Sequence, residues 1–543
     1  MRDRLHWTAL ILGCAAFLAI LIQVPQFLHV IDPRFQGIFV PLNSDESVYL
    51  ARVQEALIGR PELAAEAFIG DPAIKGTQLA MLETWYGTLF RWTGFRAATV
   101  LQIMDSVNVF FLFILLWMYL RLCGFTRRHA LIGAVLFSSI ELYNLNRPVH
   151  LAGSTLLTLA ALSGILLGMR FHRGLGIAGG ILLGTLVGVY VWSWMWGWGF
   201  YGMALLVAGC WLLREKNSVS VDTFVRLLIF GLVAVLFALP HVWHLWTLSH
   251  DPLYAEAVFR SGMHPGRAPE SWPYSILFTT MLGSVLIAYI RDPQGLRRYE
   301  GVLATIATAW IVIHQQVFHG IVFNYVSHEL LLLVISALSV VLLAWVYRTR
   351  LLFLGAGAAI IYLVAVAYDG RFVWKQYHPS EGRFEQQHLA SALPALDALP
   401  QSTVLSSSKG SAFIAGFTHM DIVYSIYLKN LLMSHEEIAQ RYCMTVLPLP
   451  PEQRHIRDHQ HLVYPDAVAA FHDDPTVRER EVAMVEKVCA EFDSDPVAAL
   501  RKFHISYIFW DMRSDSEWDL SRLHVKLEKI SEGDGWSLWQ VPR

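Results

Sequence analysis

Long apolar segments alternate with short polar connections over the first two thirds of the chain. Because a bilayer core requires about 20 apolar residues per helix, this pattern predicts about eleven membrane-spanning helices. They are expected at residues 6–28, 97–121, 129–145, 151–170, 174–193, 195–213, 222–245, 273–290, 300–317, 328–347 and 351–368. The first segment follows "MRDR", but "IQVPQFLHV" lacks a small-x-small cleavage site, which predicts a retained anchor instead of a removed signal peptide.

Basic residues occur in alternate connections. These connections are "MRDR", "TRRH", "RFHRG", "REKNSVSVDTFVR", "RDPQGLRRY" and "YRTR". Lys and Arg concentrate in cytoplasmic loops, so the pattern predicts a cytoplasmic N-terminus. A long first outer loop (29–96) then lies outside, and an odd number of spans also places the C-terminal part outside.

The last third of the chain has a different pattern. Residues 402–407 ("STVLSS"), 505–510 ("ISYIFW") and the closing "GWSLWQV" indicate strands, while "HEEIAQRYCM" (435–444) and "DPVAALRKFH" (495–504) indicate helices. This alternation is typical of a layered α/β domain. We therefore predict a polytopic α-helical transmembrane domain over 1–368 and a soluble extracytoplasmic α/β domain over 369–543, which should fold as a separate module.

Composition supports a membrane protein. The 543 residues are 55% hydrophobic and 16% charged, with a mean hydropathy of +0.42. The formal net charge of −2 argues against a nucleic-acid partner. Cys443 and Cys489 lie in the polar tail and could form a disulfide if the tail is outside the cytoplasm, but the sequence does not give their separation in space.

One motif is rejected because of its context. "GLGIAGG" (174–180) matches the dinucleotide-binding fingerprint G-x-G-x-x-G, but no strand precedes it and it opens a predicted membrane helix. Gly176, Gly180, Gly184 and Gly188 recur every four residues. This spacing predicts a small-residue face for close helix packing.

The first outer loop contains the main candidate chemistry. In "PLNSDESVYLARVQEALIGR" (41–60), the adjacent acids Asp45 and Glu46 precede an amphipathic helix pattern, and "LETWYGTLFRWTGF" (82–95) repeats that pattern with more aromatic residues. Two interfacial helices around an acidic turn would hold carboxylates where lipid head groups meet water. The alternative is that paired loop acids are simply solvated.

Further polar residues are expected on the same outer face. The first loop adds Arg52, Lys75 and Glu83, the third predicted helix ends near Arg147 and His150, and later loops contribute Glu256, Arg260, Arg267, Glu270 and His328. Asp105 lies inside a predicted membrane helix, where an ionisable group is costly, so it should face a polar cavity or a partner. The pair His455 and His459 does not make a metal site without further ligands.

Three stretches carry a resemblance to a known family. "SDESVYLARVQEALIGRPEL", "HDPLYAEAVFRSGMHPGRAPESWPY" and "HQQVFHGIVFNYVSHE" resemble blocks of a bacterial group within the GT-C glycosyltransferase superfamily, and the similarity covers most of the chain. The resemblance implies a sugar donor linked to polyprenyl phosphate and an extracytoplasmic acceptor, which would be a cell-envelope glycan, a lipid or a protein. It also implies a place in the bacterial inner membrane, in contact with membrane lipids.

The resemblance assigns the first-loop acid to catalysis, often as a base. It places this acid at Asp45, with Glu46 in support. In some members the acid binds a divalent metal, but here Asp45 is followed directly by Glu46 instead of forming D-x-D. No cofactor is certain, and a Mg or Mn ion held by Asp45 and Glu46 stays open.

The chemistry agrees with this assignment. A carboxylate can take the proton of an attacking sugar hydroxyl, and cations can stabilise the departing phosphate. The residues assigned to substrate and donor-phosphate binding are Arg52, Lys75, Glu83, Arg147, His150, Arg260 and Arg267. Those assigned to supporting roles are Asp105, Glu256, Glu270 and His328.

Two other functions remain open. A transporter or flippase of lipid-linked saccharides would favour internal repeats and broken helices near the midplane, whereas the polar residues here cluster outside. A non-catalytic envelope-assembly scaffold would use the tail to bind a glycan or a partner.

Overall fold

The computed structural model describes residues 2–39, 46–323, 330–376, 384–458, 462–471 and 474–542. The chain divides into two compact units. We call Met1–Pro25, Gln102–His244 and Pro265–His378 the helical unit. We call Gln26–Leu101, Leu245–His264 and Pro379–Arg543 the loop–tail unit.

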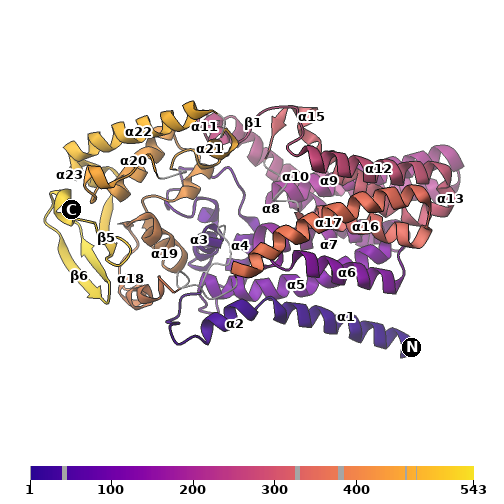
Figure 1. Cartoon of the computed structure of the whole chain (residues 1–543), viewed down its shortest axis with the longest axis horizontal. Helices are drawn as coiled ribbons and strands as arrows, with labels where there is room; N and C mark the ends of the chain where they lie inside the picture. The colour runs from indigo at the N-terminus through magenta and orange to yellow at the C-terminus, as the bar shows by residue number, and fades with distance from the viewer. Residues whose placement is uncertain are drawn as a thin grey trace. The chain divides into compact units, whose positions relative to one another are not determined.

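The helical unit is built from long apolar helices and a few short ones (Figure 1). They are α1 (Arg2–Leu21), α5 (Ala97–Leu122), α6 (Arg127–Glu141), α7 (Ser154–Arg170), α8 (Arg173–Val189), α9 (Val191–Glu215), α10 (Ser218–Ser249), α12 (Trp272–Arg291), α13 (Pro293–Leu296), α14 (Glu300–Ile313), α15 (Gln315–His319), α16 (Leu330–Tyr347) and α17 (Arg350–Gln376). Large aromatic residues fill its interior, among them Tyr119, Trp196, Phe200 and Phe278. Many other large apolar side chains, such as those of α10, face outward, as expected for helices solvated by lipid.

Every predicted membrane segment contains a helix, but fewer of these helices can span a bilayer. Six described helices are long and apolar enough, or seven if α1 and α2 (Val24–Val30), which bend by 42°, count as one span. The difference arises from length: α14 has 14 residues and is about 21 Å long, shorter than the bilayer core. A multi-pass helical architecture is therefore confirmed, and the number of about eleven spans stays a prediction.

The predicted glycine face of α8 lies against a neighbouring helix. A Cβ added at Gly176 would lie 2.0 Å from the Phe230 ring, and one at Gly180 would lie 2.5 Å from the Phe230 carbonyl oxygen. At Gly184 it would lie 2.3 Å from the Ala234 carbonyl oxygen. The packing interpretation is confirmed at these three positions, because only glycine leaves room for α10.

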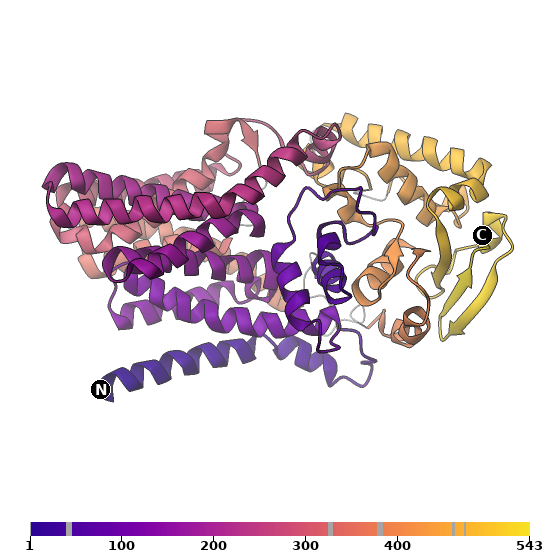
Figure 2. The same cartoon turned by 180° about the vertical axis from the view of Figure 1, so that it is seen from behind.

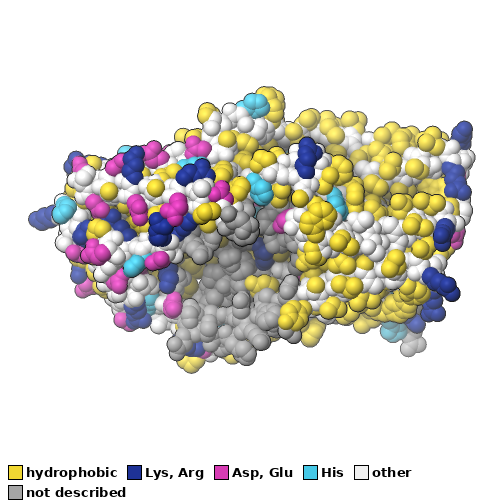
Figure 3. Space-filling model, turned by 45° about the horizontal axis from the view of Figure 1, so that its top comes forward, with side chains coloured by type: hydrophobic (Ala, Val, Ile, Leu, Met, Phe, Trp, Pro, Cys, Tyr) yellow, Lys and Arg dark blue, Asp and Glu magenta, His cyan; other side chains and the backbone are white. Residues whose placement is uncertain are grey.

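The basic turns of the helical unit meet at one end. The Arg298 guanidinium donates to the Gly124 carbonyl at 2.6 Å, and Arg297 pairs with Glu215 at 2.6 Å. Figure 3 shows Lys and Arg gathered at the end where α13 lies, while hydrophobic side chains cover the flank of the helices. The side of the membrane that this end faces stays a prediction.

The loop–tail unit contains a five-stranded sheet of order β4-β3-β5-β7-β6. Its strands are β3 (Thr403–Leu405), β4 (Asp421–Ile422), β5 (Ile505–Asp511), β6 (Glu528–Gly533) and β7 (Trp536–Gln540). Strand β3 is parallel to β4 and β5, while β7 is antiparallel to β5 and β6. The helices of this part are α18 (Leu393–Asp397), α19 (Ser408–Phe417), α20 (His435–Val446), α21 (Pro465–Ala470), α22 (Pro475–Ser494) and α23 (Pro496–Lys502). The strands and helices predicted in the tail lie where the sequence placed them.

A disulfide joins two tail helices. Cys443 on α20 and Cys489 on α22 are bonded, with their Cα atoms 5.2 Å apart. The sequence left this pairing open. The bond links residues 46 positions apart, and in the chain-entropy model such a closure contributes about 4 kcal/mol to stability.

The first outer loop forms part of the same unit as the tail. It supplies α3 (Glu46–Leu57), η1 (Pro61–Glu66) and α4 (Met81–Phe90), and α11 (Tyr254–Arg260) comes from a later loop. The Ile422 amide donates to the Phe68 carbonyl at 2.9 Å, and the Leu432 amide donates to the Lys75 carbonyl at 2.8 Å. Figures 1 and 2 both show α3 beside α19. The domain boundary after residue 368 stays a prediction, and these contacts show that the tail shares its core with residues of the first loop.

Candidate functional site

The acidic motif leads into a buried helix. Asp45 lies outside the described residues, and Glu46 is the first residue of α3, with 4% of its surface exposed. Tyr49 and Val53 are fully buried on the same helix. A Cβ added at Gly416 of α19 would meet Leu50 at 3.3 Å. Helix α3 is therefore a core helix of the loop–tail unit, and the prediction that it lies in the membrane interface is wrong because protein covers its apolar positions.

A buried ion pair connects α3 with α4. Arg52 and Glu83 are 2% and 0% exposed, and Nη1 of Arg52 lies 3.0 Å from Oε1 of Glu83. Nη2 of Arg52 also donates to the Gln78 side-chain oxygen at 3.2 Å. Both charged residues were predicted to bind the donor phosphate, but here they contact each other. Their assignment to phosphate stays a prediction, while their pairing fixes the acidic helix against α4.

Two further carboxyl groups, one on α3 and one on η1, lie in an environment that favours their neutral forms. Burial raises the pKa of Glu55 to about 8, against the opposing effect of Arg60, which lies 2.7 Å away. Burial likewise raises the pKa of Glu66, whose Oε1 accepts a hydrogen bond from the Gly76 amide at 2.8 Å. The sequence analysis did not select Glu55 or Glu66. Their only signal was the density of acids in the loop.

The other predicted cations of this unit differ in availability. Lys75 is exposed, and its ammonium makes no side-chain hydrogen bond or ion pair with any described residue. Arg260 is fully buried and donates to the carbonyls of Leu431 and Met433 at 2.6 and 2.9 Å. Burial lowers the pKa of Arg260 to about 10. Lys75 is thus open to a ligand, whereas Arg260 holds the backbone of the tail.

The structure describes three of the four remaining predicted residues of the later loops. Glu256 accepts a hydrogen bond from the His435 amide at 2.6 Å, within the loop–tail unit. In the helical unit, Arg267 donates to the Val317 carbonyl at 2.7 Å, and Glu270 is exposed. His328 lies outside the described residues.

The helical unit has a polar cluster where α6 gives way to α7. Asp105 is 1% exposed on α5, and Asn108, one turn further, donates to the Pro148 carbonyl at 2.7 Å. Pro148 starts the π-helical segment η3 (Pro148–Gly153), a kind of segment that often marks a functional site. The His150 ring stacks on the Tyr190 ring, with centroids 4.4 Å apart. The Asn108 hydrogen bond and the stacking of His150 on Tyr190 both lie within this unit.

Further polar side chains of this cluster lie in the segment between α6 and α7. Glu141 is fully buried and accepts from the Asn144 side chain at 2.6 Å, and Arg147 immediately precedes η3. The sequence analysis missed Asn108 and Tyr190. The spacing of Asp105 and Asn108, three residues apart on one helix face, was a usable signal for Asn108.

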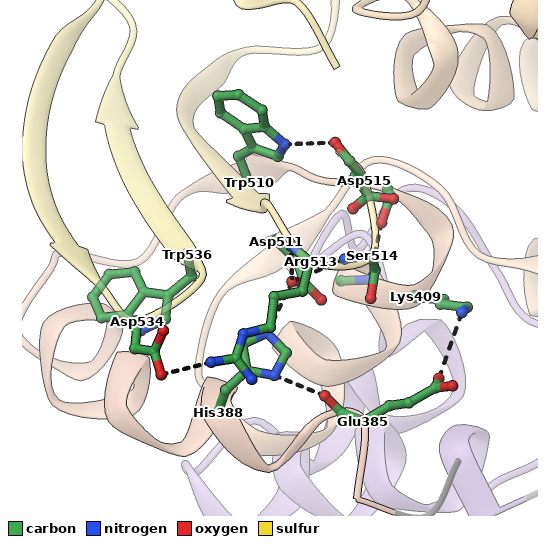
Figure 4. A network of polar contacts seen from close by, with 12 residues as sticks. Glu385, His388, Lys409, Trp510, Asp511, Arg513, Ser514, Asp515, Asp534 and Trp536 are labelled. Atoms are coloured by element: carbon green, nitrogen blue, oxygen red, sulfur yellow. Dashed lines mark hydrogen bonds and ion pairs between the residues drawn. The ribbon is translucent and has the colours of Figure 1, made fainter. Parts of the chain in front are cut away.

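The tail contains a polar network at the end of β5 (Figure 4). Oδ1 of Asp511 accepts from His388 Nε2 at 2.9 Å and from the Arg513 amide at 3.1 Å. Nδ1 of His388 lies 2.7 Å from the Glu385 carbonyl oxygen, so both ring nitrogens face hydrogen-bond acceptors. Burial raises the pKa of the neighbouring Asp515 to about 6. This network fastens η6 (Gln387–Ala392) to β5, and the sequence analysis missed it.

A metal site stays a prediction. Over the described ranges, no group of three or more His, Cys, Asp or Glu side chains is arranged to hold a metal ion. Asp45 is not among those residues, so the pair Asp45 and Glu46 is not tested.

Known proteins give the following comparisons. No protein-family model and no curated protein matches the sequence. The fold is similar to the oligosaccharyltransferase of Archaeoglobus fulgidus tethered with an acceptor peptide, with a TM-score of 0.44, 12% identity, and coverage of 98% of this chain and 74% of that chain. It is also similar to ArnT from Cupriavidus metallidurans bound to undecaprenyl phosphate, with a TM-score of 0.46, 11% identity and 98% of each chain covered. The apo state of that ArnT gives a TM-score of 0.44 at 11% identity, covering 99% of this chain and 98% of that one.

These structural neighbours are GT-C glycosyltransferases, the class that the sequence resembles. At TM-scores below 0.5 the likeness carries no argument about the donor, the acceptor or the residues of this chain.

Proposed function

We propose that this protein is an integral membrane glycosyltransferase that moves a sugar from a polyprenyl-phosphate-linked donor to an extracytoplasmic acceptor. The observation that carries the proposal is the buried helix α3, which begins at Glu46 directly after Asp45 and is fixed by the ion pair of Arg52 with Glu83. A helix N-terminus favours ionised carboxylates. A fixed carboxylate base is what an acceptor hydroxyl requires.

In the proposed reaction, the acceptor oxygen attacks the anomeric carbon of the donor sugar. Asp45 takes the hydroxyl proton as the new C–O bond forms, and the bond between the sugar and the phosphate oxygen breaks. The products are the glycosylated acceptor and polyprenyl phosphate. Glu46 orients Asp45 or helps to hold a Mg or Mn ion, and the exposed Lys75 binds the phosphate.

A groove in the helical unit supports a lipid-linked donor. Helices α9, α12 and α14 line a cavity of about 470 Å³ whose walls include Leu206, Val207, Leu286 and Leu303. Leu206 and Leu286 are 57% and 41% exposed, so the cavity opens sideways toward lipid. A long prenyl chain needs a lateral groove of this kind, which a soluble donor does not require.

We place the tail and the acidic helix outside the cytoplasm of a bacterial inner-membrane protein. The disulfide between Cys443 and Cys489 supports this side, because such bonds persist in oxidising compartments. Helix α17 starts near the basic turn at Arg348 and ends before the tail, so the tail leaves from its other end. A phosphatase reporter fused after Tyr368 should be active, whereas one fused after Lys216 should be inactive. The reverse pattern would contradict the orientation.

The decisive experiment tests Asp45. Purified variants in nanodiscs receive synthetic polyprenyl-phosphate sugars together with candidate acceptors, and release of polyprenyl phosphate is measured. Asp45→Asn keeps the shape and removes the basicity, so transfer should fall by at least about a hundredfold. Glu46→Gln should cost less, unless a metal is bound. Glu62→Gln is the matched control, because Glu62 is an exposed acid of the same loop. Transfer by Asp45→Asn near the wild-type rate would refute the assignment.

One alternative also has structural support. The bend of 42° between α1 and α2 interrupts a helix, a feature that also occurs in secondary transporters. Movement of a labelled lipid-linked sugar across vesicles without any transfer would favour that alternative.

A further inference from the structure

Helix α4 has apolar side chains on both of its faces. Its inner face packs on α3: Tyr86 is 6% exposed, and a Cβ added at Gly87 would lie 2.4 Å from the Ala56 Cβ. Its outer face carries Trp85 and Leu89, and Trp92 follows one turn later. These side chains are 42%, 65% and 86% exposed, respectively. Trp85 and Leu89 are four residues apart and share one side of α4, and Trp92 lies in the turn that follows the helix. Large aromatic side chains grouped in this way call for an apolar cover.

A cavity of about 310 Å³ lies at the end of α4, within the loop–tail unit. The end of α3 contributes Gln54, Leu57 and Ile58, the turn after α4 contributes Arg91, Gly94, Phe95 and Arg96, and the tail contributes Asp397 and His419. The cavity thus combines the first loop and the tail, and its rim includes the 44% exposed Phe95.

The cavity carries uncompensated positive charge. Arg96 donates to the Asp397 carboxylate at 2.8 Å and to the Phe417 carbonyl at 2.6 Å. The Arg91 side chain makes no hydrogen bond or ion pair with any described residue. Its Nη2 would lie only 2.9 Å from a Cβ at Gly59, so Gly59 leaves room for the guanidinium. One acid and two arginines line the cavity, which leaves a net positive charge.

The chain itself brings this cavity to the membrane surface. Helix α5 (Ala97–Leu122), which is long and apolar enough to span a bilayer, begins directly after Arg96. Residues at the end of such a helix lie at head-group level, where Trp is enriched and Arg can bind phosphate with two parallel hydrogen bonds.

We propose that the cavity lined by Arg91 and Arg96 binds the phosphate head group of an anionic bilayer lipid, whose alkyl chains cover the face formed by Trp85, Leu89 and Trp92. This site is separate from the proposed sugar transfer, since none of its residues belongs to the acidic motif or to the polar cluster of the helical unit. It would anchor the loop–tail unit to the bilayer.

Native mass spectrometry of the full-length protein tests this proposal. Protein extracted from nanodiscs that contain equal amounts of phosphatidylglycerol and phosphatidylcholine should retain phosphatidylglycerol preferentially. Arg91→Gln should weaken that retention by about tenfold, because a charge-assisted hydrogen bond is lost. Arg91→Lys should be intermediate. Arg501→Gln, which changes an exposed arginine on α23 of the same unit, should match the wild type.

Two more measurements test whether the bound phosphate belongs to a lipid and whether the apolar face contributes to binding. Excess inorganic phosphate should not displace the retained lipid, and Trp92→Ser should lower retention without changing the unfolding temperature. Equal retention of both lipids, complete displacement by inorganic phosphate, or unchanged retention in Arg91→Gln would each overturn the proposal. Since Arg91 contacts no described partner, its substitution should not disturb folding, and the readout does not depend on transfer activity.

Discussion

The two units of this protein differ in how they treat charge. Among the described residues, the helical unit buries only Asp105 and Glu141 as charged side chains, and Lys and Arg gather at the end where α13 lies. The loop–tail unit buries whole ion pairs, such as Arg52 with Glu83, and the charged Arg260. Under the proposed function, this difference would let the helices hold the lipid chain of the donor while the loop–tail unit fixes charged groups for the reaction.

The largest expected effect is on folding of the tail when it is separated from the first loop. A fragment of residues 379–543 should be poorly folded, because β4 and the segment around Leu431 would lose their bonds to residues 68–77. A fusion of residues 46–101 to this fragment should unfold cooperatively in a chemical denaturation monitored by circular dichroism. Cooperative unfolding of the tail alone would instead support the sequence-based domain boundary.

The next largest effect concerns the buried ion pair. Glu83→Ala leaves the Arg52 guanidinium buried without its partner and should destabilise the loop–tail unit by about 3–5 kcal/mol. The exposed pair of Arg173 with Asp222 in the helical unit provides the contrast. There, Arg173→Gln should cost less than about 1 kcal/mol. Thermal unfolding in detergent measures both, and equal costs would contradict the contrast between the units.

Removing the disulfide is expected to cause a somewhat smaller loss of stability. Replacing Cys443 and Cys489 together by Ser should destabilise the loop–tail unit by about 2–4 kcal/mol, because the unfolded chain gains freedom. The exposed free Cys210 of the helical unit is the control, and Cys210→Ser should leave stability unchanged. An identical unfolding temperature with and without a reducing agent would show that the bond does not contribute.

The smallest expected effect is a dependence of the unfolding temperature on pH. Burial raises the pKa of Glu55 to about 8 in the folded protein, from its ordinary value of 4.5. The folded state therefore holds this proton more tightly, and its contribution to stability is complete below about pH 4.5 and is lost as the pH rises to about 8. Glu55→Gln should flatten the decline of the unfolding temperature over this range. Glu452→Gln, which removes an exposed acid of the tail, should not change it.

Much of the architecture was predictable from the sequence. The apolar segments give helices at every predicted position, and the tail strands β3 and β5 coincide with short runs rich in β-branched and aromatic residues. Length limited the count of spans, because an apolar segment that is interrupted by polar residues, such as the one at α14, forms a shorter helix than its apolar stretch suggests.

The environments of α3 and α4 were not predictable, although both follow the same amphipathic pattern. Helix α3 is covered by α19, which lies about 360 residues later in the chain, whereas Trp92 after α4 stays exposed. Periodicity identifies an apolar face but does not identify its partner. The same limit applies to the candidate site: the sequence selected Arg52, Glu83 and Arg260 as charged loop residues, but not the partners that each of them contacts.

The bridge between Gly76 and Leu431 has a consequence for biosynthesis. The two residues are separated by 355 positions (431 minus 76), so a ribosome that adds roughly 5–20 residues per second needs roughly 20–70 s between them. During that interval the acidic segment has been made, but the residues that complete its core have not. The nascent chain therefore passes through a period in which its acidic helix lacks its final support, and its assembly depends on completion of the polypeptide.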